Sequence, residues 1–221
     1  MIRALLFDFD GLVLDTEGPD FLAWQEIYEE HGCFLPLSAW AAAIGTSDGF
    51  DPYAYLEAQL GRPVHREEVR ARYRQRTAEL IEPLLPLPGV REYVAEAQRL
   101  GLKLGMASSS SREWVTGPLR RLGLLAAFEA IKCSDDVQYT KPDPELYHAL
   151  LAALGLKAHE AVALEDSPNG IRAATRAGIF CVAVPNPLTR QLSLEEVDLQ
   201  LASLAEMPLE ALLQLAARKR V

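Results

Sequence analysis

The chain is poor in cysteine and histidine, with three cysteines and four histidines in 221 residues. Cys33, Cys133 and Cys181 are odd in number, far apart in the sequence and never arranged as Cys-x-x-Cys. The histidines show no spacing that is typical of metal ligands. We therefore expect reduced, packed thiols, and neither a disulfide framework nor a zinc site.

Long hydrophobic runs are also missing, because no apolar stretch approaches the roughly 20 residues that a membrane-spanning helix needs. Met1–Ala4 leads at once into an apolar strand, which leaves no room for a signal peptide, so we expect a cytoplasmic protein with no membrane partner. An excess of positive charge is lacking too: the formal net charge is −9 and the basic residues are scattered. This distribution argues against a nucleic-acid partner.

The start of the chain combines an apolar run with paired acids. Ile2–Phe7 has strand character and ends in Asp8-Phe9-Asp10-Gly11. Residues two apart on a strand point the same way, so the two carboxylates lie together with no adjacent Lys or Arg. An all-oxygen site of this kind suits Mg²⁺. The alternative is that the aspartates merely end a strand and that Asp15 caps the next helix.

The periodicity of the chain changes near Pro83. Residues 15–82 are mainly helical, with one helix that stops at Gly32 and further helices from Ser38, Pro52 and Arg66. From Pro83 onward helices and strands alternate, which predicts right-handed crossovers and a doubly wound, Rossmann-like parallel sheet of the α/β class. We therefore predict an α/β core domain of residues 1–14 and 83–221, and a small helical domain of residues 15–82 inserted into it.

The elements expected after Pro83 are helix Val90–Leu100, strand Leu102–Ala107, helix Trp114–Leu122, strand Ala130–Cys133, helix Pro144–Leu154, strand Ala161–Leu164, helix Asn169–Ala177, strand Phe180–Val184, an edge strand at Asp198–Leu201 and a last helix to about Ala217. Doubly wound sheets bind ligands beyond the carboxyl ends of their strands. Polar residues that directly follow these strands are therefore the candidates for a site.

Three later segments carry such residues. Ser108–Ser111 precedes a helix, where hydroxyl and backbone N–H groups favour phosphate, although ordinary helix caps would look the same. Lys141 stands in Lys-Pro-x-Pro, where two prolines stiffen the loop, whereas an isolated lysine is usually solvated. Glu165-Asp166 follows another strand and is acidic like the first segment. Together these segments suggest a phosphate and metal site at one edge of the sheet.

The four segments resemble, in order, the motifs of the haloacid-dehalogenase-like (HAD) phosphohydrolases. The pattern Asp-x-Asp-Gly-x-x-x-Asp-Thr-Glu at Asp8 to Glu17 is similar to the first motif, and Ser108, Lys141 and Glu165-Asp166 match the second to fourth. The resemblance covers nearly the whole chain. The helical insert resembles the cap of subclass I, which includes β-phosphoglucomutase and many sugar-phosphate phosphatases.

The resemblance implies a Mg²⁺-dependent phosphatase of a small phosphate ester, in particular a sugar phosphate. Asp8 would be the nucleophile that forms an aspartyl-phosphate, and Asp10 the general acid and base. Mg²⁺ would bind Asp8, Asp166 and the Asp10 carbonyl, while Lys141 would contact the nucleophile and the phosphate. The residues implied in support are the phosphate donors Ser108 and Ser109, and Glu165 and Asn169 beside the metal.

Specificity is expected in the cap, with Thr16, Asp20, Trp24, Gly45, Thr46, Ser47 and the arginines between Arg66 and Arg76 as candidates. The alternative is that Trp24 belongs to the core and that most of these arginines face solvent. Asp20 stands where β-phosphoglucomutase has a histidine, which favours a phosphatase over a phosphomutase. The phosphomutase and a non-catalytic phosphate-binding regulatory protein remain the alternatives. The oligomeric state stays open, with a monomer allowed.

Overall fold

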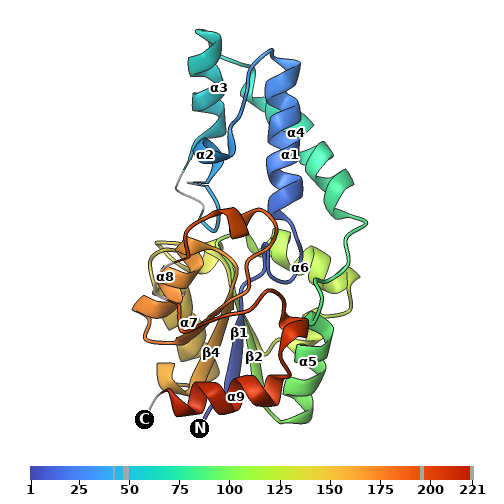
Figure 1. The fold of residues 1–221 in the computed structure, drawn as a ribbon. Helices are drawn as coiled ribbons and strands as arrows, with labels where there is room; N and C mark the ends of the chain where they lie inside the picture. The colour runs from blue at the N-terminus through green and yellow to red at the C-terminus, as the bar shows by residue number, and fades with distance from the viewer. Residues whose placement is uncertain (42, 47–49, 195–196, 220–221) are drawn as a thin grey trace.

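The computed structural model describes residues 1–41, 43–46, 50–194 and 197–219, and its centre is a six-stranded parallel sheet. The strand order is β3-β2-β1-β4-β5-β6. The expected doubly wound α/β fold is confirmed (Figure 1). The strands are β1 Ala4–Phe7, β2 Lys103–Ala107, β3 Ala130–Lys132, β4 Ala161–Glu165, β5 Phe180–Ala183 and β6 Leu199–Gln200.

The central strand β1 lies where the strand order reverses, between β2 and β4. Phe7 pairs with Met106 of β2 and with Leu164 of β4, so the residues that follow these three strands emerge at one edge. The sequence predicted that β4 ends at Leu164, but the strand continues through Glu165, whose backbone pairs with Ala183 of β5. β1 begins at Ala4 and not at Ile2.

Side chains alternate between two hydrophobic cores, one on each face of the sheet. Leu5 and Phe7 of β1 belong to the core beneath α5, α6 and α9, and Ala4 and Leu6 to the core beneath α7 and α8. The covering helices are α5 Val90–Arg99, α6 Arg112–Arg121, α7 Glu145–Leu154, α8 Pro168–Arg176 and α9 Leu209–Arg218. The sheet is thus buried on both faces, which explains why its strands are almost entirely apolar.

A separate group of helices stands beyond the carboxyl ends of the strands (Figure 1). These helices are α1 Glu17–Glu30, α2 Leu37–Trp40, α3 Pro52–Leu60 and α4 Arg66–Ile81. They share a third hydrophobic core, in which Trp24 is only 3% exposed, as the core alternative for this residue predicted. The Trp24 ring stacks on Tyr73 with centroids 4.9 Å apart. The division of the chain at residues 15 and 82 stays a prediction.

The remaining elements are short. 3₁₀ turns lie at Leu125–Ala127, Ser134–Asp136, Ala158–Glu160, Thr189–Gln191 and Leu204–Glu206. The expected edge strand near residue 199 is present as β6, which pairs in parallel with β5. None of the helices in the described part of the chain combines the length and apolarity needed to cross a membrane.

Candidate active site

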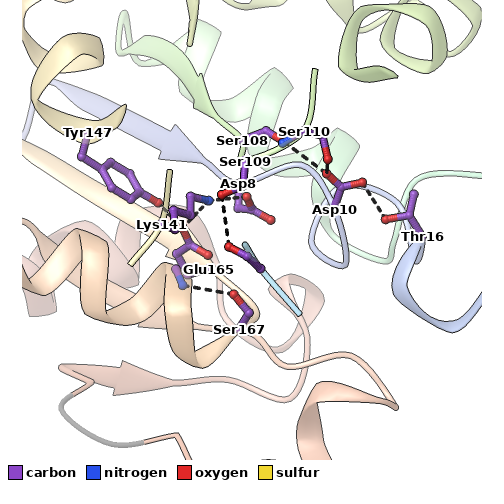
Figure 2. A network of polar contacts seen from close by, with 12 residues as sticks. Asp8, Asp10, Thr16, Ser108, Ser109, Ser110, Lys141, Tyr147, Glu165 and Ser167 are labelled. Atoms are coloured by element: carbon purple, nitrogen blue, oxygen red, sulfur yellow. Dashed lines mark hydrogen bonds and ion pairs between the residues drawn. The ribbon is translucent and has the colours of Figure 1, made fainter. Parts of the chain in front are cut away.

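Four strand-end segments meet at the carboxyl edge of the sheet, as the motif order predicted. Asp8 follows β1, Ser108 follows β2 and Asp166 follows β4, while Lys141 comes from the loop before α7. Figure 2 shows Asp8, Lys141 and Glu165 close together at this edge, with Asp10 beside the serines. Asp8, Lys141, Glu165 and Asp166 are each at most 5% exposed.

Lys141 connects two carboxylates in this buried site. Its ammonium donates to Asp8 Oδ1 and lies 2.7 Å from Glu165 Oε1. Burial opposes the positive charge of Lys141, but Asp8 and Glu165 outweigh it and raise the lysine pKa. Burial is also the main reason that the pKa of Asp8 rises to about 8, with Lys141 opposing and Glu165 adding to the rise. Asp8 therefore needs further positive charge nearby if it is to act as an anion at neutral pH.

Glu165 is held by two donors on one of its carboxylate oxygens. The Tyr147 hydroxyl and the Lys141 ammonium both contact its Oε1 atom. Its Oε2 atom is buried and has no hydrogen-bond partner among the described residues. A side chain at Gly170, near the start of α8, would overlap the Glu165 carboxylate. Glycine is therefore required there for the helix to approach the acid.

A second buried carboxylate oxygen also lacks a partner. Asp166 accepts a hydrogen bond from Asn186 Nδ2 at 2.8 Å through Oδ2, while its Oδ1 is unpaired within the described part of the chain. Burial, followed by the charge of Asp8, raises the pKa of Asp166 well above its usual value. Unpaired buried carboxylate oxygens are costly, and a cation would satisfy them.

The acids at this edge fit a divalent metal ion. Asp8, Glu165 and Asp166 each offer one oxygen, and these atoms all lie within 4.8 Å of one another. An all-carboxylate donor set suits a hard cation. The two orphaned oxygens support the same conclusion, because one ion could contact both acids. A metal site at the first and fourth motifs is therefore compatible with the structure.

The side chain of Asp10 lies outside this acidic group and is held by a set of donors (Figure 2). Thr16 Oγ1 and Trp114 Nε1 donate to its Oδ1 at 2.8 and 2.7 Å. Ser108 Oγ and Ser110 Oγ donate to its Oδ2 at 3.2 and 2.7 Å. Thr16, expected to act in specificity, thus contacts the second aspartate of the motif.

The serines after β2 join the sheet to the helices above it. Ser109 Oγ donates to the carbonyl oxygen of Gly45 at 3.1 Å, and Asn169 Nδ2 donates to that of Ile44 at 2.9 Å. A side chain at Gly45, which has φ +75°, would overlap Ser167 Oγ. The Ile44–Gly45 segment is therefore docked on the residues that follow β2 and β4. Asn169, expected to support the metal, contacts this segment.

A cavity of about 530 Å³ opens in front of Asp8 and Asp10 and is also lined by residues of α1, α3 and α4. Asp20 and Thr46 line it, and the Tyr73 hydroxyl donates to Asp20 Oδ1. Ser47, also expected in the specificity set, lies outside the described residues. A larger groove of about 820 Å³ between α5 and α9 shares no residue with this cavity.

The arginines between positions 66 and 76 differ in their surroundings. Arg66, Arg72 and Arg76 form ion pairs with Glu57, Glu30 and Glu26. Arg74 is exposed and lines the cavity. Of the expected basic residues, Arg74 is thus the one placed to meet a ligand.

Sequence reasoning missed several residues of the site. Asn186 could have been found, because it follows β5 at the same edge of the sheet. Tyr147 and Trp114 carry no such signal, since each looks like an ordinary apolar position of a helix. Ser110 was noted only as part of a serine-rich loop. Glu17 was read only as part of the first motif, although it is 8% exposed and lines the cavity.

Comparison with known proteins agrees with this arrangement. A family model described as "Haloacid dehalogenase-like hydrolase" matches residues 5–184. A Bacillus subtilis (strain 168) protein named "Putative phosphatase YhcW" is 50% identical over 96% of this chain and 97% of its own length. Hexitol phosphatase B of Escherichia coli (strain K12) is 31% identical over 96% of this chain and 97% of its own.

Solved structures are similar as well. CbbY from Rhodobacter sphaeroides, solved as a mutant in complex with xylulose-(1,5)bisphosphate, is 31% identical with a TM-score of 0.79, covering 93% of this chain and 96% of its own. A structure described as a β-phosphoglucomutase candidate from Thermotoga maritima is 27% identical with a TM-score of 0.75. The match covers 96% of this chain and 99% of that one. On the family match and these relatives, the chain belongs to the haloacid dehalogenase-like hydrolases and is a hydrolase of phosphate esters.

Proposed function

We propose that this protein is a Mg²⁺-dependent phosphatase that releases inorganic phosphate from a small phosphorylated sugar or polyol through an aspartyl-phosphate on Asp8. The observation that carries the proposal is the position of Asp8. It is buried beside Lys141, within 4.8 Å of oxygens from two further acids, and at the inner end of a cavity. Relatives named for hexitol phosphate and for validoxylamine A 7'-phosphate support the substrate class.

Cancelling negative charge is the first requirement of the reaction, because a carboxylate must approach a phosphate dianion. Lys141 supplies one positive charge at Asp8 Oδ1. Mg²⁺ held by Asp8, Asp166 and the Asp10 carbonyl, with Glu165 beside it, would supply the rest and keep Asp8 ionised, as a Lewis acid on the phosphoryl oxygens. The serine-rich turn before α6 adds donors at a helix N-terminus, and we keep Ser108 and Ser109 as proposed phosphate contacts.

In the first chemical step an Asp8 carboxylate oxygen forms a bond to phosphorus while the bond from phosphorus to the ester oxygen breaks. Asp10 gives a proton to the departing alkoxide. In the second step water attacks phosphorus and loses its proton to Asp10, the bond to Asp8 breaks, and phosphate leaves. This step restores the free Asp8 carboxylate and the protonated Asp10, and the net reaction consumes one water.

Asp10 must change its contacts during this cycle. All of its observed acceptor positions are used by Thr16, Ser108, Ser110 and Trp114. A carboxyl group that accepts from this set must lose some of these contacts before it can give a proton to a leaving group in the cavity. We propose that substrate entry provides the competing contacts, and that residues 15–82 act as the cap that excludes bulk water.

A phosphomutase is the second candidate, favoured by the likeness to the Thermotoga maritima structure. It would pass the phosphoryl group from Asp8 to another sugar hydroxyl, where the phosphatase passes it to water. Asp20 in the cavity argues against it, since the histidine that assists the sugar hydroxyl in β-phosphoglucomutase is replaced here.

A substrate panel tests the proposal. Sugar and polyol monophosphates are incubated with Mg²⁺ and with wild type, Asp8→Asn or Glu29→Gln, the last being an exposed acid of α1 outside the site. We expect phosphate release that Asp8→Asn abolishes and Glu29→Gln keeps. Isomerised sugar phosphate without free phosphate would establish the mutase instead. Unchanged phosphate release in Asp8→Asn would contradict both assignments.

A further inference from the structure

Two carboxylates of α1 face the substrate cavity, and neither belongs to the motif chemistry. Glu17 and Asp20 are three residues apart on the helix, so they share one side of it, and both line the cavity. Neither forms an ion pair with Lys or Arg within the described part of the chain. The backbone N–H of Gly45 hydrogen bonds to Glu17, and the Tyr73 hydroxyl donates to Asp20. The wall of the cavity that α1 forms is therefore acidic.

Burial raises the pKa of both acids, that of Asp20 to about 7, and the charge of Asp10 adds to the rise in each. For Glu17 the repulsion comes first from Asp10 and then from Asp20. Above about pH 7 Asp20 is ionised, so the cavity then holds a negative charge that is poorly solvated. Another anion placed inside would meet the same electrostatic cost again.

The rest of the wall suits a carbon chain that bears hydroxyl groups. Trp24 stacks on Tyr73, and the Tyr53 ring meets Trp24 edge-on with centroids 5.0 Å apart. These rings offer apolar faces, while Asp20 has one described hydrogen bond and a second oxygen that can accept from a hydroxyl. A polyol presents both features, since its C–H faces can pack on rings and its hydroxyls can donate to carboxylates.

One basic residue, Arg74, lines the same cavity. It is exposed, and it also lines the neighbouring cleft between α4 and α6, whose wall includes Glu82 and Glu113. Arg74 therefore stands at the rim, where it can attract a phosphate ester from solution. It does not neutralise the acids on the inner wall.

We propose that Glu17 and Asp20 make the enzyme selective for monophosphates whose remaining part is an uncharged polyhydroxylated chain, and that they reject substrates carrying a second phosphate. This inference rests on the proposed phosphatase function and adds its selectivity. It distinguishes this chain from the relative CbbY, whose structure holds a bisphosphate.

The test compares kcat/KM at pH 8, where Asp20 is ionised, for sorbitol 6-phosphate, glucose 6-phosphate and glucose 1,6-bisphosphate, with p-nitrophenyl phosphate as a generic ester. We expect wild type to prefer the monophosphates by roughly tenfold or more, as two like charges a few ångströms apart require. Asp20→Asn keeps the shape and the Tyr73 contact but removes the charge, so the preference should shrink several-fold. Glu29→Gln removes an equal charge outside the cavity and should leave the preference unchanged.

Other outcomes of this test would contradict either the selectivity or the phosphatase function. Equal turnover of the bisphosphate and the monophosphates by wild type would overturn the inference while leaving the phosphatase function in place. An unchanged preference in Asp20→Asn, with its folding verified by circular dichroism, would remove Asp20 from the selectivity. Loss of bisphosphate turnover in Arg74→Gln alone would show a second phosphate held at the rim and would also overturn the inference. Failure to hydrolyse any ester, including p-nitrophenyl phosphate, would instead contradict the proposed function.

Discussion

The Lys141 ammonium lies 2.7 Å from Glu165 Oε1 and also donates to Asp8, in a site where the three side chains are almost completely shielded from solvent. Lys141→Met would leave two buried carboxylates without their cation. Breaking a buried ion pair in this way costs about 3–5 kcal/mol. We expect a loss of unfolding free energy of that order in metal-free buffer at neutral pH.

Activity should fall as well in Lys141→Met, by roughly 10² to 10³ in kcat, because a positioned charge next to the reacting group is lost. Urea unfolding and steady-state kinetics measure the two effects. The control is Lys157→Met, which removes an exposed lysine before β4 and should change neither. Near wild-type stability and turnover in Lys141→Met would show that the lysine is not part of the site.

Removal of the metal should be visible without any substrate. Since Asp8, Glu165 and Asp166 repel one another when ionised, a bound divalent cation stabilises the folded chain. At about 100 times the dissociation constant the gain is about 2.7 kcal/mol. We expect Mg²⁺ to raise Tm in wild type and Glu29→Gln, and EDTA to reverse the rise. Asp166→Asn should respond far less, and a full response of this variant would argue that the ion binds elsewhere.

Gly45 offers a matched test of the contact between the helices and the sheet. Gly45 and Gly61 have φ +75° and +65°, so alanine costs roughly 1–2 kcal/mol of backbone strain at either position. Only at Gly45 would the new side chain also meet Ser167, because nothing lies within 4 Å of the Gly61 position.

We expect both variants to lose unfolding free energy, Gly45→Ala more than Gly61→Ala because of the added contact with Ser167, and a fall in kcat/KM on the order of 10² in Gly45→Ala alone. The physical reason is displacement of the Ile44–Gly45 segment from Ser109 and Asn169. Parallel urea titrations and kinetics on the two variants provide the measurement. Equal kinetics in both would mean that this docking has no part in turnover.

Asp20 should make stability depend on pH. Its pKa rises from an ordinary value of 3.8 to about 7 in the folded chain, mainly through burial, so the folded state holds a proton that the unfolded state releases. Folding is therefore favoured at low pH, and this contribution fades as pH rises from about 4 to about 7. Asp20→Asn does not titrate and should lack the trend.

The measured quantity is the difference in unfolding free energy between wild type and Asp20→Asn from pH 5 to pH 8 with Mg²⁺ present. We expect wild type to lose ~1–2 kcal/mol relative to the variant over this range, less than the full shift implies, because the cavity admits water. If the difference in unfolding free energy between wild type and Asp20→Asn stayed constant from pH 5 to pH 8, the Asp20 pKa would lie near its ordinary value.

The sequence predicted the sheet well because buried parallel strands are short apolar runs, and the acids that end them interrupt those runs visibly. Asp8 and Asp166 were predicted as site residues for this reason, whereas Lys141 was predicted from the Lys-Pro-x-Pro pattern. The strand limit at Glu165 was missed because a charged residue normally ends a buried strand. Here Lys141 and Tyr147 compensate the charge, and both come from distant segments. Such compensation depends on tertiary contacts and leaves no local pattern.

The hydrogen-bond partners of Asp10 and Asp20 were also not predictable from the sequence. Trp114 and Tyr73 look like core residues of helices, yet their polar atoms donate to these acids. Aromatic residues with a polar tip serve in both roles, so composition and spacing do not separate them. The pairing of Ser109 with Gly45 also joins residues that are distant in the sequence, and it appears only when the helices dock on the sheet.

The most direct test of the account is to trap the covalent intermediate. Wild type, or Asp10→Asn to slow its breakdown, is mixed with a sugar monophosphate and Mg²⁺, quenched and treated with borohydride, which reduces an aspartyl-phosphate to homoserine. Peptide mass spectrometry should then find homoserine at position 8, and only when substrate was present. Homoserine at another acid, or steady phosphate release with Asp8 never modified, would contradict the central role of Asp8.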